Sequence, residues 1–245
     1  MAPFARRRTR VVLGIAVLLA VLAPLAMWIR SSSLVAVRDV SVTGIEGSQA
    51  KQITRALQAA GRDMTTLDVR EEALRSAVAT YPVVRSLRTE TDFPHRLHIV
   101  VNAYEPVAAV RSGAGLTAVA GDGTLLRGSA TRGLPVVAIR SRRGGDRLGR
   151  GHALGAVRLM ASAPRALRNR VARVYLGPRG VTATMQNGPK LYFGGAAEPG
   201  AQWGAASQVL ASSTSRGAAY VDLRIPDRPV AGGLRPRGEE TQPTL

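Results

Sequence analysis

The chain has 245 residues, a formal charge of +18 at pH 7 and no cysteine. The lack of cysteine excludes disulfides, thiol catalysis and cysteine metal sites, so the domains must be stable through core packing alone. Aromatic residues make up only 4% of the chain, and the arginines are scattered along it instead of clustering with aromatics on one element. This pattern argues against nucleic-acid binding and favours a solvated basic surface.

An uncharged apolar run, Val11 to Ile29, follows a basic N-terminal tail at residues 1–10. A helix of this length matches a hydrocarbon core of about 30 Å, and arginines before a first span keep the N-terminus in the cytoplasm. Trp28 lies where an indole anchors at the far headgroup layer. The run predicts one transmembrane helix, with Val11, Trp28 and Ile29 as anchor residues and the bulk of the chain outside the cytoplasmic membrane.

The alternative interpretation of this run is a cleaved signal peptide. Signal peptides have an apolar region of about 7 to 15 residues, followed by a small-x-small cleavage site. The run here is longer, and Ala23-Pro24-Leu25-Ala26 makes a poor cleavage site because proline stands where a small residue is needed. We therefore expect an uncleaved anchor.

Beyond the anchor, the pattern predicts strand, helix, helix, strand, strand. The elements are a strand from Leu34 to Gly44, a helix capped by Ser48 and stopped by Gly61, a helix from Glu71 that ends before Pro82, and strands at Val83–Thr91 and Arg96–Ala103. Asp92-Phe93-Pro94-His95 forms the turn between the last two strands. In the second of these strands, Leu97, Ile99 and Val101 alternate with other residues and are the expected core positions.

The distal half is rich in predicted strands. Strands are expected at Ala108–Arg111, Thr117–Ala120, Thr124–Leu126, Pro135–Ile139, Val171–Leu176, Val181–Met185, Leu191–Gly194, Tyr220–Arg224 and Val230–Ala231. Helices are expected over Leu154–Met160, stopped by Pro164, and over Gln202–Ser212, while Ser141–Gly151 is expected to be a loop. Residues 232–245 combine glycine, proline and charge and are predicted to be disordered.

Several of these segments together resemble a known family. They are Val37–Gly44, the Tyr81-Pro82-x-Val84 turn, the Asp92-Phe93-Pro94 hairpin and the exit Glu105-Pro106-Val107-Ala108, which look like the POTRA domain of the FtsQ/DivIB cell-division proteins. The distal half resembles the β domain of the same family, most clearly at Tyr220–Arg224. The resemblance implies an α+β fold: a transmembrane helix, a POTRA domain (β-α-α-β-β) at residues 34–104, and a β-rich domain with flanking helices at residues 105–231.

The resemblance also implies a function. FtsQ-like proteins are non-enzymatic scaffolds of the divisome in the bacterial inner (cytoplasmic) membrane at the division septum, and their last strands accept a strand from an FtsB-like protein that pairs with an FtsL-like one. Carried over to this chain, the partner-binding residues are Tyr220, Asp222, Arg224, Ile225 and Val230. The guanidinium of Arg224 suits an acidic partner residue. The resemblance also implies that the protein helps control septal peptidoglycan synthesis, with the septal peptidoglycan synthase as a further partner.

Strand addition also follows from physical reasoning, because an unpaired sheet edge exposes N–H and C=O groups that a partner strand can satisfy. The alternative is that the chain's own tail covers the last strand. The final strand is short and broken by glycine, which leaves the length of any open edge undecided at this stage.

Other arrangements of reactive residues are weak. His95 and His98 lie two residues apart and His152 is distant in sequence, so a third metal ligand is missing and we expect no metal. Ser48-Gln49-Ala50-Lys51 matches the S-x-x-K of serine enzymes that act on penicillin, but the partner motifs S-x-N and K-T-G do not occur. The carboxylates of Glu105 and Asp122 form no recognisable pair, and no nucleotide-binding motif occurs, so no cofactor or small-molecule substrate is expected.

Two alternative functions remain. The first is a membrane-anchored cell-wall enzyme or wall-polymer-binding protein, which would use the basic surface to attract anionic polymers. The second is the POTRA chaperone of an outer-membrane barrel assembly factor, which would require a C-terminal barrel or repeated POTRA units that the sequence lacks.

Overall fold

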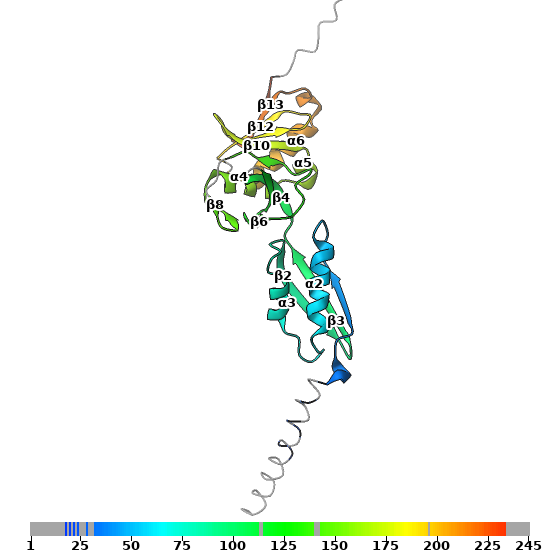
Figure 1. Ribbon diagram of the computed structural model, residues 1–245. Helices are drawn as coiled ribbons and strands as arrows, with labels where there is room; N and C mark the ends of the chain where they lie inside the picture. Colours follow the sequence, from blue (N-terminus) through cyan, green and yellow to red (C-terminus); the bar gives the residue numbers. More distant parts are fainter. Residues whose placement is uncertain are drawn as a thin grey trace, which may run out of the picture. The chain divides into compact units, whose positions relative to one another are not determined.

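The computed structural model describes residues 32–112, 115–139, 143–195 and 197–233, together with residues 18, 20, 22, 24 and 28. The chain divides into two compact units, Met1–Ala103 and Tyr104–Leu245 (Figure 1). Each unit is an α+β structure with its own sheet and its own core.

The first unit is a three-stranded sheet with two helices against it. Its elements are the 3-10 helix η1 (Ser33–Val35), β1 (Asp39–Thr43), α2 (Ala50–Arg62), α3 (Glu71–Ala77), β2 (Val84–Asp92) and β3 (Arg96–Ala103). The strand order is β1-β3-β2, with β1 parallel and β2 antiparallel to the central strand β3. Ile53 and Leu57 of α2, Leu74 of α3, and Leu97 and Ile99 of β3 are fully buried in one cluster. The predicted element order and the alternation in β3 are confirmed.

The start of the first helix differs from the prediction. Gln49, not Ser48, occupies the N-cap position, and the Gln49 side chain forms no capping hydrogen bond. Gly61 lies inside the last turn and does not end the helix, which runs on to Arg62. A Cβ at Gly61 would meet Leu97 Cδ2 at 3.1 Å and Val40 Cγ2 at 3.2 Å. Glycine at this position therefore lets α2 approach the sheet closely.

The second unit is built on one long mixed sheet. Its strands are β4 (Pro106–Ser112), β5 (Gly115–Ala120), β6 (Leu125–Leu126), β7 (Val136–Val137), β10 (Val171–Gly177), β11 (Gly180–Met185), β12 (Lys190–Gly194), β13 (Tyr220–Asp222) and β14 (Val230–Gly232). Their order is β14-β13-β12-β11-β10-β7-β4-β5-β6. The antiparallel β10-β11-β12 meander is confirmed.

Two helices supply most of the remaining core of the second unit. They are α4 (His152–Ala161) and α6 (Pro199–Ala211), and they share one cluster with inward-facing strand residues such as Val174 and Leu191. Trp203 of α6 is 1% exposed, stacks at 4.8 Å on Phe193, and donates a hydrogen bond from Nε1 to the Leu159 carbonyl at 2.8 Å. Because that carbonyl lies in the last turn of α4, Trp203 satisfies a group that the helix itself leaves unpaired.

Two local predictions in this unit were wrong. The predicted loop at 141–151 contains the hairpin β8 (Arg143–Gly144) and β9 (Arg147–Leu148). The predicted helix stop before Pro164 is confirmed, since α4 ends at Ala161, but the short helix α5 (Arg165–Arg168) that follows was not predicted. The sequence of the β8-β9 hairpin shows no strand periodicity. The hairpin is held instead by tertiary pairing with the segment at β6, where Leu125 N donates to Asp146 O at 2.8 Å. The structure also extends β14 to Gly232, where the tail was predicted to begin.

The predicted membrane anchor falls largely outside the described residues. Val11, Ile29 and the basic tail at residues 1–10 are not among them, nor are residues 234–245. Leu18, Leu22 and Trp28 are described, and their side chains are exposed. A search of the described part of the chain finds no helix with the length and apolar character that crossing a membrane requires.

Candidate partner-binding site

The strand β14 lies at one edge of the long sheet, and within the described residues no further strand pairs with it. The opposite edge, β6, is different. There Leu148 N donates to Gly123 O at 2.8 Å, and Thr124 forms a bridge with Arg147, so the β8-β9 hairpin covers that side. Among the described residues the two edges of the sheet are therefore unequal, and the unpaired edge, β14, carries the residues that the sequence singled out.

The hydrogen-bond pattern shows which backbone groups of β14 face outward. Leu223 N donates to Tyr192 O at 2.8 Å, so residue 223 faces β12. Backbone groups alternate sides along a strand, and Asp222 therefore faces β14, where it pairs with Val230. Val230 accordingly directs its N–H and C=O to β13. It follows that Ala231, one residue on, presents its N–H and C=O to the open side.

A cleft of about 430 Å³ lies beside this edge, lined by Asp222, Arg224, Ile225, Arg228 and Val230. The side chain of Ile225 is 63% exposed and that of Val230 is 56% exposed. The structure thus brings together four of the five predicted site residues around an apolar surface flanked by arginines. Such a surface can accept an apolar side chain from a strand added at Ala231.

Arg224 already has an acidic partner within the chain. Its Nε and Nη2 donate to both carboxylate oxygens of Asp222, with Nη2 at 2.7 Å from Oδ2, and its backbone N–H donates to Oδ1 at 3.1 Å. The hydrogen bond from the Arg224 side chain lowers the pKa of Asp222, which stays ionised. This turn ends β13 at Asp222, two residues earlier than predicted.

Tyr220, the fifth predicted residue, lies next to the cleft and covers the glycine of the edge strand. A Cβ at Gly232 would lie 2.4 Å from Tyr220 Cζ and Oη, so the ring passes directly over the glycine. The ring also lies 5.6 Å from that of Tyr192, and the guanidinium of Arg179 is 5.2 Å from its centroid. The lack of a side chain at Gly232 therefore makes room for the tyrosine ring, and β14 is a short strand that ends at this glycine.

Gln202 is a functional neighbour that sequence reasoning missed. It is 2% exposed, and its Nε2 donates to Phe193 O at 2.9 Å and to Leu223 O at 3.0 Å. Gln202 thereby satisfies the carbonyl of Phe193 in β12 and the carbonyl of Leu223 just after β13, and it joins these two strands to α6. The available signal was a polar side chain next to a tryptophan on a largely apolar helix.

The other candidate sites have ordinary partners. His98 Nδ1 lies 2.7 Å from Ser41 Oγ, and His95 Nδ1 lies 3.0 Å from Ala36 O. Ser48 and Lys51 stand at the start of α2. No cluster of three or more metal-ligating side chains occurs among the described residues.

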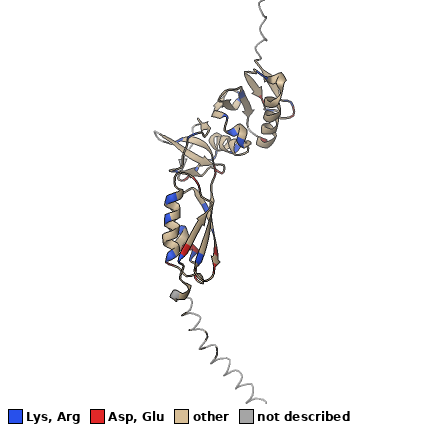
Figure 2. Ribbon diagram, turned by 90° about the vertical axis from the view of Figure 1, so that its right-hand side faces the viewer, with Lys and Arg blue, Asp and Glu red and all other residues tan. Residues whose placement is uncertain are grey.

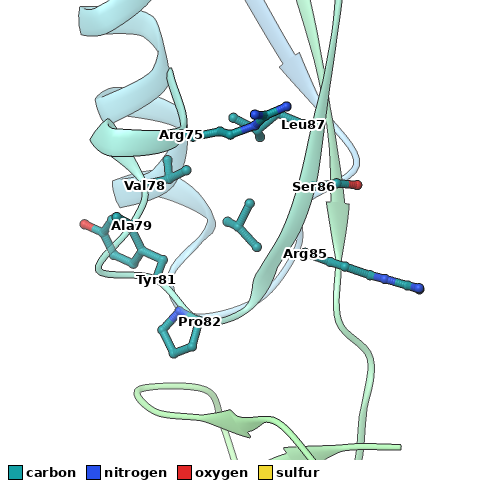
Figure 3. A pocket seen from close by; sticks show the side chains of 9 residues that line it. Arg75, Val78, Ala79, Tyr81, Pro82, Arg85, Ser86 and Leu87 are labelled. Atoms are coloured by element: carbon teal, nitrogen blue, oxygen red, sulfur yellow. The ribbon is translucent and has the colours of Figure 1, made fainter. Parts of the chain in front are cut away.

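A second hollow lies in the first unit between α3 and β2 (Figure 3). Its volume is about 430 Å³, and its lining residues are Arg75, Val78, Ala79, Tyr81, Pro82, Val84, Arg85, Ser86 and Leu87. The lining contains no carboxylate and no imidazole. Its titratable side chains are Arg75, Tyr81 and Arg85.

Glu105 joins two arginines near the start of the second unit. Its Oε2 accepts from Arg165 Nη2 at 2.9 Å and its Oε1 from Arg168 Nη2 at 2.6 Å, while Asp122 pairs separately with Arg147 at 2.8 Å. The hydrogen bond from Arg165, followed by that from Arg168, holds the pKa of Glu105 below its usual value, against the opposing effect of burial. Arg168 is itself buried, so the Glu105 carboxylate offsets the cost of taking the guanidinium out of water.

Replacing Glu105 with glutamine is expected to lower the free energy of unfolding of the second unit by about 1 to 2 kcal/mol at pH 7, because Glu105 is half exposed and its pairs are partly screened. The pKa of Glu105 is lower in the folded protein than in the unfolded chain, where it is about 4.5, so ionised Glu105 stabilises the fold above that pH. This stabilisation disappears as the pH falls through the folded-state pKa. The difference between the two proteins should therefore be full above about pH 5 and shrink below it.

Urea unfolding from pH 3 to 8 measures this difference. The matched control is Glu71→Gln, which removes an exposed i,i+4 pair with Arg75 and should cost no more than about 0.5 kcal/mol. Equal effects of the two substitutions at every pH would show that the Glu105 pairs contribute nothing beyond a surface ion pair.

Comparison with known families gives two matches. A model described as the FtsQ-type POTRA domain matches residues 35–104, and a model described as the C-terminal part of the cell division protein FtsQ/DivIB matches residues 108–224. No curated protein matches the chain. The two matched segments follow one another in the order of the two structural units and together cover most of the chain. The chain belongs to the FtsQ/DivIB family of cell division proteins.

Proposed function

We propose that this protein is a non-enzymatic scaffold of the bacterial divisome that binds partner division proteins by β-strand addition at β14. Residues 11–29 anchor it in the cytoplasmic membrane at the septum, and residues 34–104 and 105–231 form its POTRA and β domains outside the membrane. The observation that carries the proposal is that no described strand pairs with the outer side of β14 in a chain of this family, with Ile225 and Val230 exposed beside it.

The partners proposed are an FtsB-like protein, which supplies the added strand, and the FtsL-like protein that pairs with it. Through them the scaffold helps control the septal peptidoglycan synthase. The main-chain groups at Ala231 supply affinity, and the apolar cleft at Ile225 and Val230 selects the side chains of the added strand. The guanidinium of Arg224 is already paired with the carboxylate of Asp222, so we assign Arg224 a role in shaping the cleft. The apolar residues Ile225 and Val230 then make the main contact with the partner strand.

The test is the double substitution Arg224→Glu and Ile225→Lys, followed by copurification with the FtsB-like protein of the same cell. Burying a lysine in the apolar cleft and reversing the flanking charge should reduce binding at least tenfold, which corresponds to about 1.4 kcal/mol. The control is Leu176→Lys, an exposed apolar position elsewhere in the second unit that should leave copurification unchanged. Undiminished capture of the partner by the double variant would remove this edge as the binding site.

The wall-polymer alternative predicts a different result. A binder that uses the basic surface alone should sediment with peptidoglycan in a strongly salt-dependent way, and the double variant should lose little of that binding.

A further inference from the structure

Three large apolar side chains are exposed at one end of the first unit. Leu34 is 65% exposed, Leu67 is 43% exposed and Phe93 is 67% exposed. They come from η1, from the connection between α2 and α3, and from the turn between β2 and β3. We call these three residues the apolar tip. All three segments lie at the end of the unit where η1 begins the described domain (Figure 1).

Hydrogen bonds hold the three segments against one another. Thr66 N donates to Val35 O at 2.9 Å, and Thr66 Oγ1 donates to Pro94 O at 3.0 Å. His95 Nδ1 lies 3.0 Å from Ala36 O. The buried hydroxyl of Thr66 therefore joins η1 to the hairpin turn, and the tip is a built surface of the domain instead of three unrelated loop residues.

The charges around the tip favour no anionic or cationic macromolecule. The exposed charged residues on or next to these connections are Arg38, Arg62, Arg70 and Arg96, with Asp39, Asp63, Asp68 and Asp92. Arg96 lies 3.7 Å from Asp92, and Arg70 donates to Asp63 O at 3.0 Å. Both signs are balanced at the tip, as they are in the first unit as a whole, where residues 32–103 carry nine basic and eight acidic side chains (Figure 2). The distinctive property of this surface is its apolar character.

The position of the tip in the chain identifies what covers it. The predicted transmembrane run ends at Ile29, and Leu34 follows five residues later. An extended chain spans at most about 17 Å over that distance, and the 3-10 turn of η1 shortens it further. The tip is therefore tethered within reach of the bilayer's headgroup layer, where apolar and aromatic side chains partition favourably.

We propose that Leu34, Leu67 and Phe93 insert into the outer headgroup layer of the membrane, so that the first unit rests on the bilayer at its tip. This interfacial contact restricts tilting of the POTRA domain about the end of its anchor. The surface is distinct from β14 and works independently of any protein partner. The proposal rests on the predicted span Val11–Ile29.

Spin labelling of the full-length chain in lipid nanodiscs tests the proposal. The chain has no cysteine, so Leu34→Cys, Leu67→Cys and Phe93→Cys each give a single labelling site. Controls are Leu116→Cys and Leu176→Cys, whose parent residues are 40% and 48% exposed in the second unit. Collision rates with oxygen, which concentrates in lipid, and with a water-soluble nickel chelate report the depth of each label.

The expected result is an oxygen-to-nickel ratio several-fold higher at all three tip sites than at both controls. Because apolar insertion is not an ion pair, the ratio should persist in about 1 M salt. Tip ratios equal to those of the controls would overturn the proposal. It would also fail if the tip labels became equally protected in detergent as protein concentration rose, since a second copy of the chain would then cover them.

Discussion

Substituting Ala231 with proline is expected to abolish strand addition while leaving the fold intact. Proline removes the outward N–H of Ala231, and its ring occupies the space where an added strand must approach. Edge strands tolerate proline when the lost N–H faces away from the sheet. Proline also restricts the residue before it to extended backbone, and Val230 is already extended as part of β14. We expect binding of the FtsB-like protein to fall at least tenfold, as measured by calorimetry with the purified partner.

Two matched variants sharpen this prediction. Ala231→Val keeps the outward N–H and should bind nearly as well as the natural protein. Val230→Pro removes an N–H that faces β13, so it should destabilise the edge itself. Full binding by Ala231→Pro would contradict addition at β14. If the chain's own tail covers the edge, removing residues 234–245 should strengthen binding, whereas an open edge predicts no change.

Truncating Trp203 to alanine is expected to have the largest effect on stability. It removes the largest buried side chain of the second core, including its packing on Phe193, and large-to-small changes of this kind cost about 3 to 5 kcal/mol. It also leaves the Leu159 carbonyl without its donor, which raises the cost further. The change should reach β10 to β13 because their inward side chains share this cluster.

Hydrogen exchange measured by mass spectrometry can locate the effect. Amides of β10 to β13 should lose protection, while those of β1 and β3 should keep it, because the first unit has a separate core. Trp203→Phe serves as the control: it retains most of the volume and loses the hydrogen bond, and should cost about 1 to 2 kcal/mol. Equal loss of protection in both units would contradict the independence of the two cores.

Much of the fold was predictable because its periodicities are local. In β3 the strict alternation at Leu97, Ile99 and Val101 determines which face is buried, and tertiary contacts only complete it. The β8-β9 hairpin was not predictable, since its pairing with residues 123–125 lies outside any local window. Gly61 was misinterpreted for a related reason: an interior packing glycine and a helix-terminating glycine look the same in sequence.

Residue type and spacing along the chain were enough to predict the order of the main strands and helices, the family resemblance and the absence of thiol chemistry, although not the β8-β9 hairpin or α5. The tertiary contacts were needed to show which sheet edge the described residues leave unpaired, that Arg224 forms an ion pair with Asp222, and that Gln202 bonds the carbonyls of Phe193 and Leu223. Edges, ion-pair partners and buried hydrogen bonds depend on which segments meet in space. A local sequence pattern does not predict these contacts, because the residues involved are far apart in the chain or have several possible partners.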